Sequence, residues 1–324
     1  MTLLLTDADV REVVDMAAIV EAVDDALAVE ARGGVQIVPR INFGLRQGFL
    51  RFMPAVIEEL DVMGFKAFDA KFPTARYLIA VFRPSTGELD CLVDAAYLTA
   101  VRTGATTGVA TRLMTATDGC REVGVIGSGL EARTNLEAIL AVREVRRVLV
   151  YSRTPERREA LAAEVRERHG IEAVAVGTPQ EAAGAPCVLA ATNTGFGGPV
   201  ALEGAWLAPD AHLNTIGATA LDLREADPET FARASAIVVD TEHAGAECGD
   251  IVAAQRAGAW PAGRVTTLAE LVGAEGGWRR PEGLSVFKSV GTAVQDLAAA
   301  HAVATAARER GVGREVELLS AKTF

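Results

Sequence analysis

The stretch Val123–Ala132 constrains the fold of this chain more than any other. It reads Val-Gly-Val-Ile-Gly-Ser-Gly-Leu-Glu-Ala, a short apolar run followed by closely spaced glycines. The run is typical of a buried strand. In such a turn Gly127 allows the sharp bend, Gly129 lets a phosphate approach the backbone, and Ala132 lets helix and strand pack closely. The pattern alone also fits an ordinary strand-to-helix turn, so its surroundings decide.

Those surroundings favour a dinucleotide-binding unit. An alanine-rich amphipathic helix is expected over Arg133–Val142, and a second apolar strand follows at Arg147–Tyr151, the spacing of a βαβ unit. From Arg121 to about Val290 strands and helices alternate, which predicts a doubly wound parallel sheet covered on both faces. The candidate strands are Val123–Ile126, Val148–Tyr151, Ala173–Val176, Val188–Ala191, His212–Ile216 and Ala236–Val239.

The preceding region follows a different pattern. Apolar residues recur at helical spacing from Leu4 to Ala31, and Gly33-Gly34 interrupts them, so one or two helices are expected. Between Gln36 and about Val93 the pattern predicts short, mostly antiparallel strands. They are Arg40–Phe43, Gly48–Met53, Gly64–Phe68 and Tyr77–Phe82, with a hairpin turn at Arg83–Leu89.

Two further helices complete the prediction. One covers Asp94–Thr115 and leads into the glycine turn, and the last covers Thr292–Arg310 and ends at Gly311. The predicted fold class is α/β, a Rossmann-type doubly wound parallel sheet inserted into an α+β domain. The predicted domains are 1–116 plus 301–324, for substrate binding and dimerisation, and 117–300, for the dinucleotide.

Composition excludes several classes of function. The 324 residues carry 32 basic and 43 acidic side chains, a net charge of −11, which argues against nucleic-acid and anionic-membrane partners. No apolar run is long enough to span a bilayer, and the N-terminus lacks the basic start of a signal peptide, so a soluble cytoplasmic protein is expected. The scattered cysteines (Cys91, Cys120, Cys187 and Cys248) and the four histidines predict neither a disulfide nor a metal site.

Several motifs together resemble the ornithine cyclodeaminase/μ-crystallin family over nearly the whole chain. Besides the glycine turn they are Arg83–Glu88, Asp94–Ala105, Ala191–Thr194, Phe287–Gly291 and Gln295–Ala298. The resemblance implies a Rossmann domain inserted into a first domain that also takes the C-terminal helix. It further implies a homodimer formed through that first domain, and chemistry on a small amino or imino acid.

The resemblance also implies which residues hold the substrate. Arg40, Lys66 and Arg102 stand at the positions that bind the α-carboxylate in the family. A planar guanidinium fork or a point cation suits that task. Arg40 fits an exposed surface charge equally well.

Two departures separate this chain from the cyclodeaminases. They place an acidic residue just before Met-Pro to hold the distal amino group of ornithine, whereas this chain has Arg51, which favours an anion. Their catalytic aspartate corresponds to Thr219, which cannot act as a carboxylate base. Asp222 lies three residues further on, and capping or salt bridging suits it better than compensation for the lost aspartate. The loop resembles the ketimine-reductase version in the family.

These features predict an enzyme, an NAD(P)H-dependent oxidoreductase that reduces an α-imino acid. Lys66 is the candidate proton donor, and with Arg51 as a second anion anchor the favoured substrate is a dicarboxylic imine such as iminosuccinate, giving aspartate. An amino-acid dehydrogenase or a cyclodeaminase acting on ornithine, alanine or a cyclic imine is one alternative. A non-catalytic, NADPH-binding μ-crystallin-like protein is another.

The second strand of the βαβ unit ends without the acidic residue that binds a ribose 2′-hydroxyl. Ser152, Arg153 and Thr154 offer a positive charge and hydroxyl donors there, which favours NADP(H) and leaves NAD(H) usable. The predicted cofactor-binding residues combine this edge, the glycine turn and the family motifs. They are Thr103, Gly127, Ser128, Gly129, Leu130, Ala132, Ser152, Arg153, Thr154, Thr192, Asn193, Gly217, Ser289 and Gly291.

Overall fold

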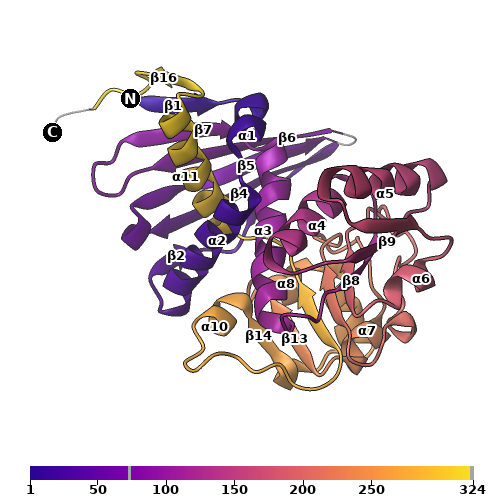
Figure 1. The fold of residues 1–324 in the computed structure, drawn as a ribbon. Helices are drawn as coiled ribbons and strands as arrows, with labels where there is room; N and C mark the ends of the chain where they lie inside the picture. The colour runs from indigo at the N-terminus through magenta and orange to yellow at the C-terminus, as the bar shows by residue number, and fades with distance from the viewer. Residues whose placement is uncertain (72–73, 322–324) are drawn as a thin grey trace. The chain divides into compact units, whose positions relative to one another are not determined.

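A computed structural model describes residues 1–71 and 74–321, and the chain separates into two compact units (Figure 1). The first unit is Met1–Thr106 together with Thr292–Phe324, and the second is Thr107–Gly291. The first change of unit therefore falls inside a helix, α3 (Ala96–Met114), and the second at the start of the last helix. The sequence placed these limits at 116/117 and 300/301. The roles given to the domains remain predictions.

The first unit holds an eight-stranded sheet in the order β16-β1-β7-β6-β5-β4-β2, with β3 also paired to β4. Its neighbours are antiparallel except β1 and β7, which are parallel. The strands are β1 (Thr2–Leu5), β2 (Val35–Ile37), β3 (Ile41–Leu45), β4 (Gly48–Ile57), β5 (Val62–Lys71), β6 (Thr74–Phe82), β7 (Leu89–Asp94) and β16 (Arg314–Val316).

A proline in the long strand β4 has a place that the pairing explains. Pro54 pairs with Phe65 of β5 on one side. On the other side, β3 pairs with Gly48–Phe52 and β2 with Ala55–Ile57, so Pro54 falls in the gap between them. Since proline has no N–H to donate, this is the position in the strand where it costs least.

One helix covers a face of this sheet. The helix α11 (Ala293–Arg310) packs on β4, β5 and β6 and against α2 (Met16–Ala31), and Figure 1 shows it in yellow across the strands. Its bounds agree with the predicted helix, Thr292–Arg310 ending at Gly311. At the N-terminus the backbone N–H of Thr292 donates to Gln295 Oε1, and at the C-terminus Gly311 is left-handed. The remaining helix of this unit is α1 (Asp7–Val13).

The second unit is a parallel eight-stranded sheet in the order β10-β9-β8-β11-β12-β15-β13-β14. This confirms the α/β, Rossmann-type fold class. The strands are β8 (Glu122–Ile126), β9 (Arg147–Tyr151), β10 (Glu172–Ala175), β11 (Cys187–Ala190), β12 (His212–Thr215), β13 (Ala236–Val239), β14 (Val265–Thr267) and β15 (Ser285–Lys288). The helices are α4 (Leu130–Val142), α5 (Pro155–His169), α6 (Pro179–Ala183), α7 (Pro228–Arg233), α8 (Ala244–Glu247), α9 (Gly249–Arg256) and α10 (Leu268–Val272).

Six strands are absent from the predicted list: β1, β2, β7 and β16 in the first unit, and β14 and β15 in the second. Thr2–Leu5 is a strand paired with β7 and β16, whereas the helical spacing predicts a helix from Leu4. All four residues of β15 are buried between β12 and β13, so the alternation of apolar and polar residues that reveals a strand is missing. Among the described residues, no helix is long and apolar enough to cross a membrane.

Candidate functional site

Two of the predicted substrate residues, Arg51 and Lys66, lie on one face of the first unit's sheet. In the antiparallel register of β4 and β5, Arg51 pairs with Phe68 and Met53 with Lys66, so their side chains share a face. This is the face that α11 covers, because Asp296 of α11 contacts Lys66 there. The strand alternation therefore carries both cations, Arg51 and Lys66, to the buried side of the sheet.

Lys66, Arg102 and Asp296 form a buried triad of charges. Lys66 Nζ lies 2.8 Å from Asp296 Oδ1 and 2.7 Å from Oδ2. Arg102 Nε donates to Asp296 Oδ1 at 2.7 Å, and its Nη1 donates to Gln295 Oε1 at 3.0 Å. Lys66 is only 2% exposed and Asp296 is fully buried. Two cations thus share one carboxylate away from water.

This environment changes the acidity of the lysine. Burial lowers the pKa of Lys66 to about 7, because desolvation penalises the ammonium form. The carboxylate of Asp296 opposes the shift, while the positive charges of Arg102 and Arg40 add to it. At that pKa the amine exchanges a proton near neutral pH, which a solvent-exposed lysine does not do.

Arg51 lies beside the same cluster. Its Nε donates to Asn42 Oδ1 at 2.7 Å, and its guanidinium carbon lies 5.0 Å from the ring centre of Phe49 and 5.3 Å from that of Phe68. Lys66 Nζ lies 5.8 Å from the same Phe68 ring. The structure therefore brings Arg51 and Lys66 to one aromatic ring, and the half-buried Arg40 is close enough to affect the pKa of Lys66.

Sequence reasoning missed two residues of this cluster. In the sequence, Asp296 and Gln295 stand out only as members of the Gln295–Ala298 family motif, which predicts no role for either side chain. The available signal was an amide and an acidic side chain next to each other in an otherwise alanine-rich helix. Both side chains are buried in the structure, and such groups are rarely buried without a partner.

The glycine turn in the second unit has the geometry of a phosphate cradle. Gly127 has φ +131°, and a Cβ there would lie 2.3 Å from the carbonyl oxygen of Ala191, so only glycine fits. Gly129 is the N-cap of α4 and has no side-chain cap, and a Cβ on it would meet nothing within 4 Å. Open space before the bare N-terminus of a long helix suits a pyrophosphate. The described residues around the turn fit a dinucleotide.

Two arginines make hydrogen bonds at the end of β9, where the ribose edge is predicted. Arg153 Nη2 donates to the carbonyl oxygen of Asn193 at 3.3 Å, and Ser152 Oγ donates to the carbonyl oxygen of Thr154 at 3.2 Å. Arg158, which the sequence analysis did not select, donates to the carbonyl oxygen of Ser152 and lies over the ring of Tyr151. Two guanidinium groups therefore lie at this edge.

Two buried carboxylates anchor the predicted residues at the other strand ends. Glu225 accepts hydrogen bonds from Thr192 and Gly217, and Asp240 accepts from Ser289 and Gly291. Leu130 begins α4, and the small Ala132 is buried in its first turn. Thr103, in the first unit, instead donates its hydroxyl to the carbonyl oxygen of Thr99 in its own helix.

The loop after β12 contains no buried carboxylate at the expected family position. Thr219 is half-buried and Asp222 is exposed. The buried acid of this loop is Glu225, 1% exposed, which the sequence analysis did not select.

Other polar groups lie outside these sites. All four cysteines are buried and free. His212 is buried between Ser285 and Asn214, and burial lowers its pKa to about 3. The described residues contain no group of three or more acidic, histidine or cysteine side chains placed to hold a metal ion.

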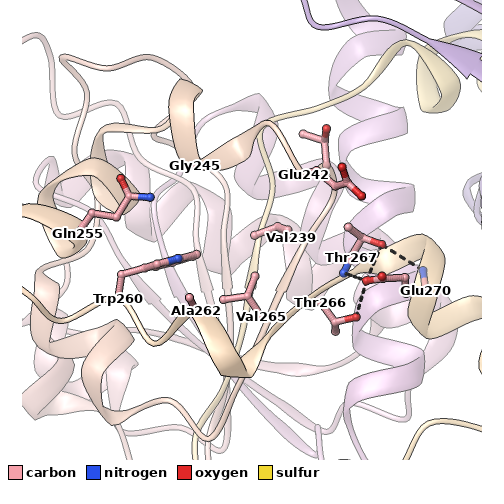
Figure 2. Close-up of a pocket in the computed structure, with 11 residues that line it drawn as sticks. Val239, Glu242, Gly245, Gln255, Trp260, Ala262, Val265, Thr266, Thr267 and Glu270 are labelled. Carbon is pink, nitrogen blue, oxygen red and sulfur yellow. Dashed lines mark hydrogen bonds between the residues drawn. The ribbon is translucent and has the colours of Figure 1, made fainter.

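A pocket of about 350 Å³ opens beside β13 and β14 (Figure 2). Trp260 and Gln255 line one side, and Glu270, which accepts from Thr266 and Thr267, lines the other. In the sheet, β11, β12 and β15 separate β13 from β8 and its glycine turn. None of the predicted site residues lines this pocket.

The second unit, with its parallel sheet and glycine turn, defines a protein of the Rossmann-type dinucleotide-binding class. The model of the Ornithine cyclodeaminase/mu-crystallin family matches residues 1–311, and the chain belongs to that family.

Individual relatives cover most of the chain. A Delta(1)-pyrroline-2-carboxylate reductase of Bacillus cereus is 31% identical over 287 residues, 86% of this chain and 87% of that protein. The structure of the Thermococcus litoralis enzyme of that name, in complex with NADH and L-proline, has a TM-score of 0.89 and 30% identity and covers 97% of this chain and 100% of that chain. An archaeal alanine dehydrogenase dimer with bound NAD has a TM-score of 0.88 and 27% identity, with 98% and 99% covered.

Proposed function

We propose that this protein reduces an α-imino acid to the amino acid with a nicotinamide cofactor. The observation that carries the proposal is the buried Lys66, whose pKa is lowered to about 7 beside Arg102 and Asp296. Reductases of a cyclic imino acid among the relatives, one of them solved with NADH and L-proline, support it.

The residues of the cluster divide the work between binding and proton transfer. Arg102 and Arg40 orient the substrate α-carboxylate, and the buried Nε2 of Gln295, which has no acceptor among the described residues, offers a further donor. Lys66 gives a proton to the imine nitrogen, so that the carbon becomes electrophilic. The bound cofactor supplies the hydride that this carbon accepts. Asp296 keeps the lysine and the arginine in place throughout.

Arg51 directs the choice of substrate toward a second anionic group. It lies on the same face of the sheet as Lys66, where the cyclodeaminases carry an acid, and two aromatic rings flank its guanidinium group. A dicarboxylic imine such as iminosuccinate, giving aspartate, places its second carboxylate against this arginine.

A substrate panel tests this choice. Turnover of oxaloacetate with ammonia is expected to exceed that of pyrroline-2-carboxylate, and Arg51→Glu should reverse the order. The substrate proposal is wrong if cyclic imines are reduced far faster by the unaltered enzyme. Arg121→Glu, an exposed arginine directly before β8 in the second unit, is the matched charge control.

The same panel separates the alternatives. Oxidation of alanine or loss of ammonia from ornithine, without imine reduction, would favour the dehydrogenase or the cyclodeaminase. Tight NADPH binding without turnover of any substrate would favour the non-catalytic protein.

We further propose that NADP(H) is preferred and NAD(H) is usable. Arg153 and Arg158 at the end of β9 provide the positive charge that a 2′-phosphate requires, and no acidic residue follows Tyr151 directly. A Michaelis constant for NADH well below that for NADPH would refute the preference.

The partner that the first unit fits is a second copy of this chain. The face of the sheet opposite Lys66 exposes large apolar side chains, among them Phe43 (55%), Leu50 (39%) and Leu78 (41%). Monomers rarely leave such a face open to water, and an archaeal relative has been solved as a dimer. Phe43→Lys is expected to give monomers in sedimentation analysis. A wild-type protein that itself sediments as a monomer would refute the proposal.

A further inference from the structure

Glu225 connects the ends of two neighbouring strands of the second unit. Its Oε1 accepts from the backbone N–H of Thr192 at 2.6 Å and from the Thr192 hydroxyl at 2.8 Å. Its Oε2 accepts from the Thr215 hydroxyl at 2.8 Å, from Ile216 N–H at 2.9 Å and from Gly217 N–H at 2.7 Å. Five donors on one buried carboxylate fix the segment after β11 against the segment after β12.

These two segments lie at the carboxyl-terminal end of the parallel strands, the same end of the sheet as the glycine turn. In a parallel sheet the carboxyl ends of β8, β11 and β12 share one edge. The carbonyl oxygen of Ala191 closes on Gly127, and Thr192 is the next residue. A Cβ on Gly217 would lie 2.2 Å from the carbonyl oxygen of Thr192 and 2.5 Å from Glu225 Oε1, so the packing leaves no room for adjustment.

The backbone of Glu225 is itself fixed by a second buried carboxylate, that of Asp250. The Glu225 backbone N–H donates to Asp250 Oδ1 at 2.7 Å, and Lys288 Nζ lies 3.5 Å from Asp250 Oδ2 and donates to the carbonyl oxygen of Thr215 at 3.3 Å. A fixed support of this kind is what keeps a binding edge in one geometry before the ligand arrives.

We infer that Glu225 is a positioning residue, which sets the ends of β11 and β12 in the arrangement that receives the dinucleotide. The inference rests on the proposed function, because it assumes that this edge binds the cofactor. Its chemistry requires a carboxylate: the amide of a glutamine accepts at one atom only and turns N–H groups toward the donors of one segment.

The test compares Glu225→Gln with Asp227→Asn by calorimetric titration with NADH and NADPH. Asp227 is the matched control, since its Oδ1 accepts three hydrogen bonds, from Thr230 N–H and hydroxyl and from Gly204 N–H, away from the two segments. Both substitutions should lower the melting temperature. Only Glu225→Gln should weaken dinucleotide binding, by about tenfold or more.

Unchanged dinucleotide affinity in folded Glu225→Gln would overturn the inference and leave the proposed function standing. A wild type that binds neither dinucleotide would overturn both. If Glu225→Gln does not fold, Thr215→Val removes one of the five donors: faster amide exchange at 215–217 with weaker binding supports the inference, and unchanged binding despite that faster exchange contradicts it.

Discussion

Two buried lysines, one in each unit, show opposite behaviour. Lys66 contacts Asp296 and Arg102, and its pKa is lowered to about 7. Lys288 lies 3.5 Å from Asp250, and its pKa is raised. Both ammonium groups are buried and both face an aspartate, so burial and pairing alone do not explain the difference.

The difference between the two pKa shifts follows from the other charged groups near each lysine–aspartate pair. Burial lowers the pKa of both lysines, but around Lys288 the neighbouring acidic groups, the carboxylates of Asp250 and Glu225 among them, outweigh it. Around Lys66 the positive charges of Arg102 and Arg40 lower the pKa further, in the same direction as burial. A lysine among acids remains a fixed cation that supports structure. A lysine among arginines is ready to give up its proton, and that is the cluster where we place the chemistry.

The largest effect is expected from Lys66→Met. Without its proton donor the enzyme should lose about 10²- to 10⁴-fold in kcat for imine reduction. The fold should persist, because Arg102 still pairs with Asp296. Stopped-flow NADPH oxidation measures the loss, and circular dichroism checks the fold. A Lys66→Met enzyme with wild-type kcat would remove Lys66 from the mechanism.

Lys288→Met should instead act on stability. It leaves the carboxylate of Asp250 buried without its cation, which costs about 3–5 kcal/mol of unfolding free energy. Urea titration followed by tryptophan fluorescence measures the difference from wild type. If Lys288→Met is as stable as wild type but has no turnover, the division between the two lysines is wrong.

A smaller effect is expected in the pH profile of Asp296→Asn. The ammonium form of Lys66 must donate, so kcat/KM for reduction should fall as the pH rises through about 7. The carboxylate of Asp296 raises the pKa of Lys66, and the loss of that carboxylate should therefore move the fall in kcat/KM to lower pH. A shift to higher pH would show that the sign of this interaction is wrong.

Local patterns made much of the fold predictable. The spacing of glycines from Gly127 to Gly129 predicted the strand, turn and helix, and Gly311 predicted the end of α11. The fully buried β15 escaped because its place depends on pairing with β12 and β13, far away in the sequence. Alternation within four residues carries no such information.

The candidate cluster was predictable only in part. Arg40, Lys66 and Arg102 came from matching family positions, and Arg51 from a departure at one of them. Asp296 lies 230 residues after Lys66 in the sequence, and only the packing of α11 on β5 joins them. The lowered pKa of Lys66 follows from that packing, so no local pattern could predict it.

The most direct measurement is the titration of the lysine side chains by ¹³C NMR. The chain has only four lysines, Lys66, Lys71, Lys288 and Lys322, so Lys66→Met and Lys288→Met assign the two buried ones. The account predicts that the Lys66 signal titrates near pH 7, while that of Lys288 stays in its ammonium form beyond pH 10. A Lys66 that also keeps its proton to pH 10 would contradict the account.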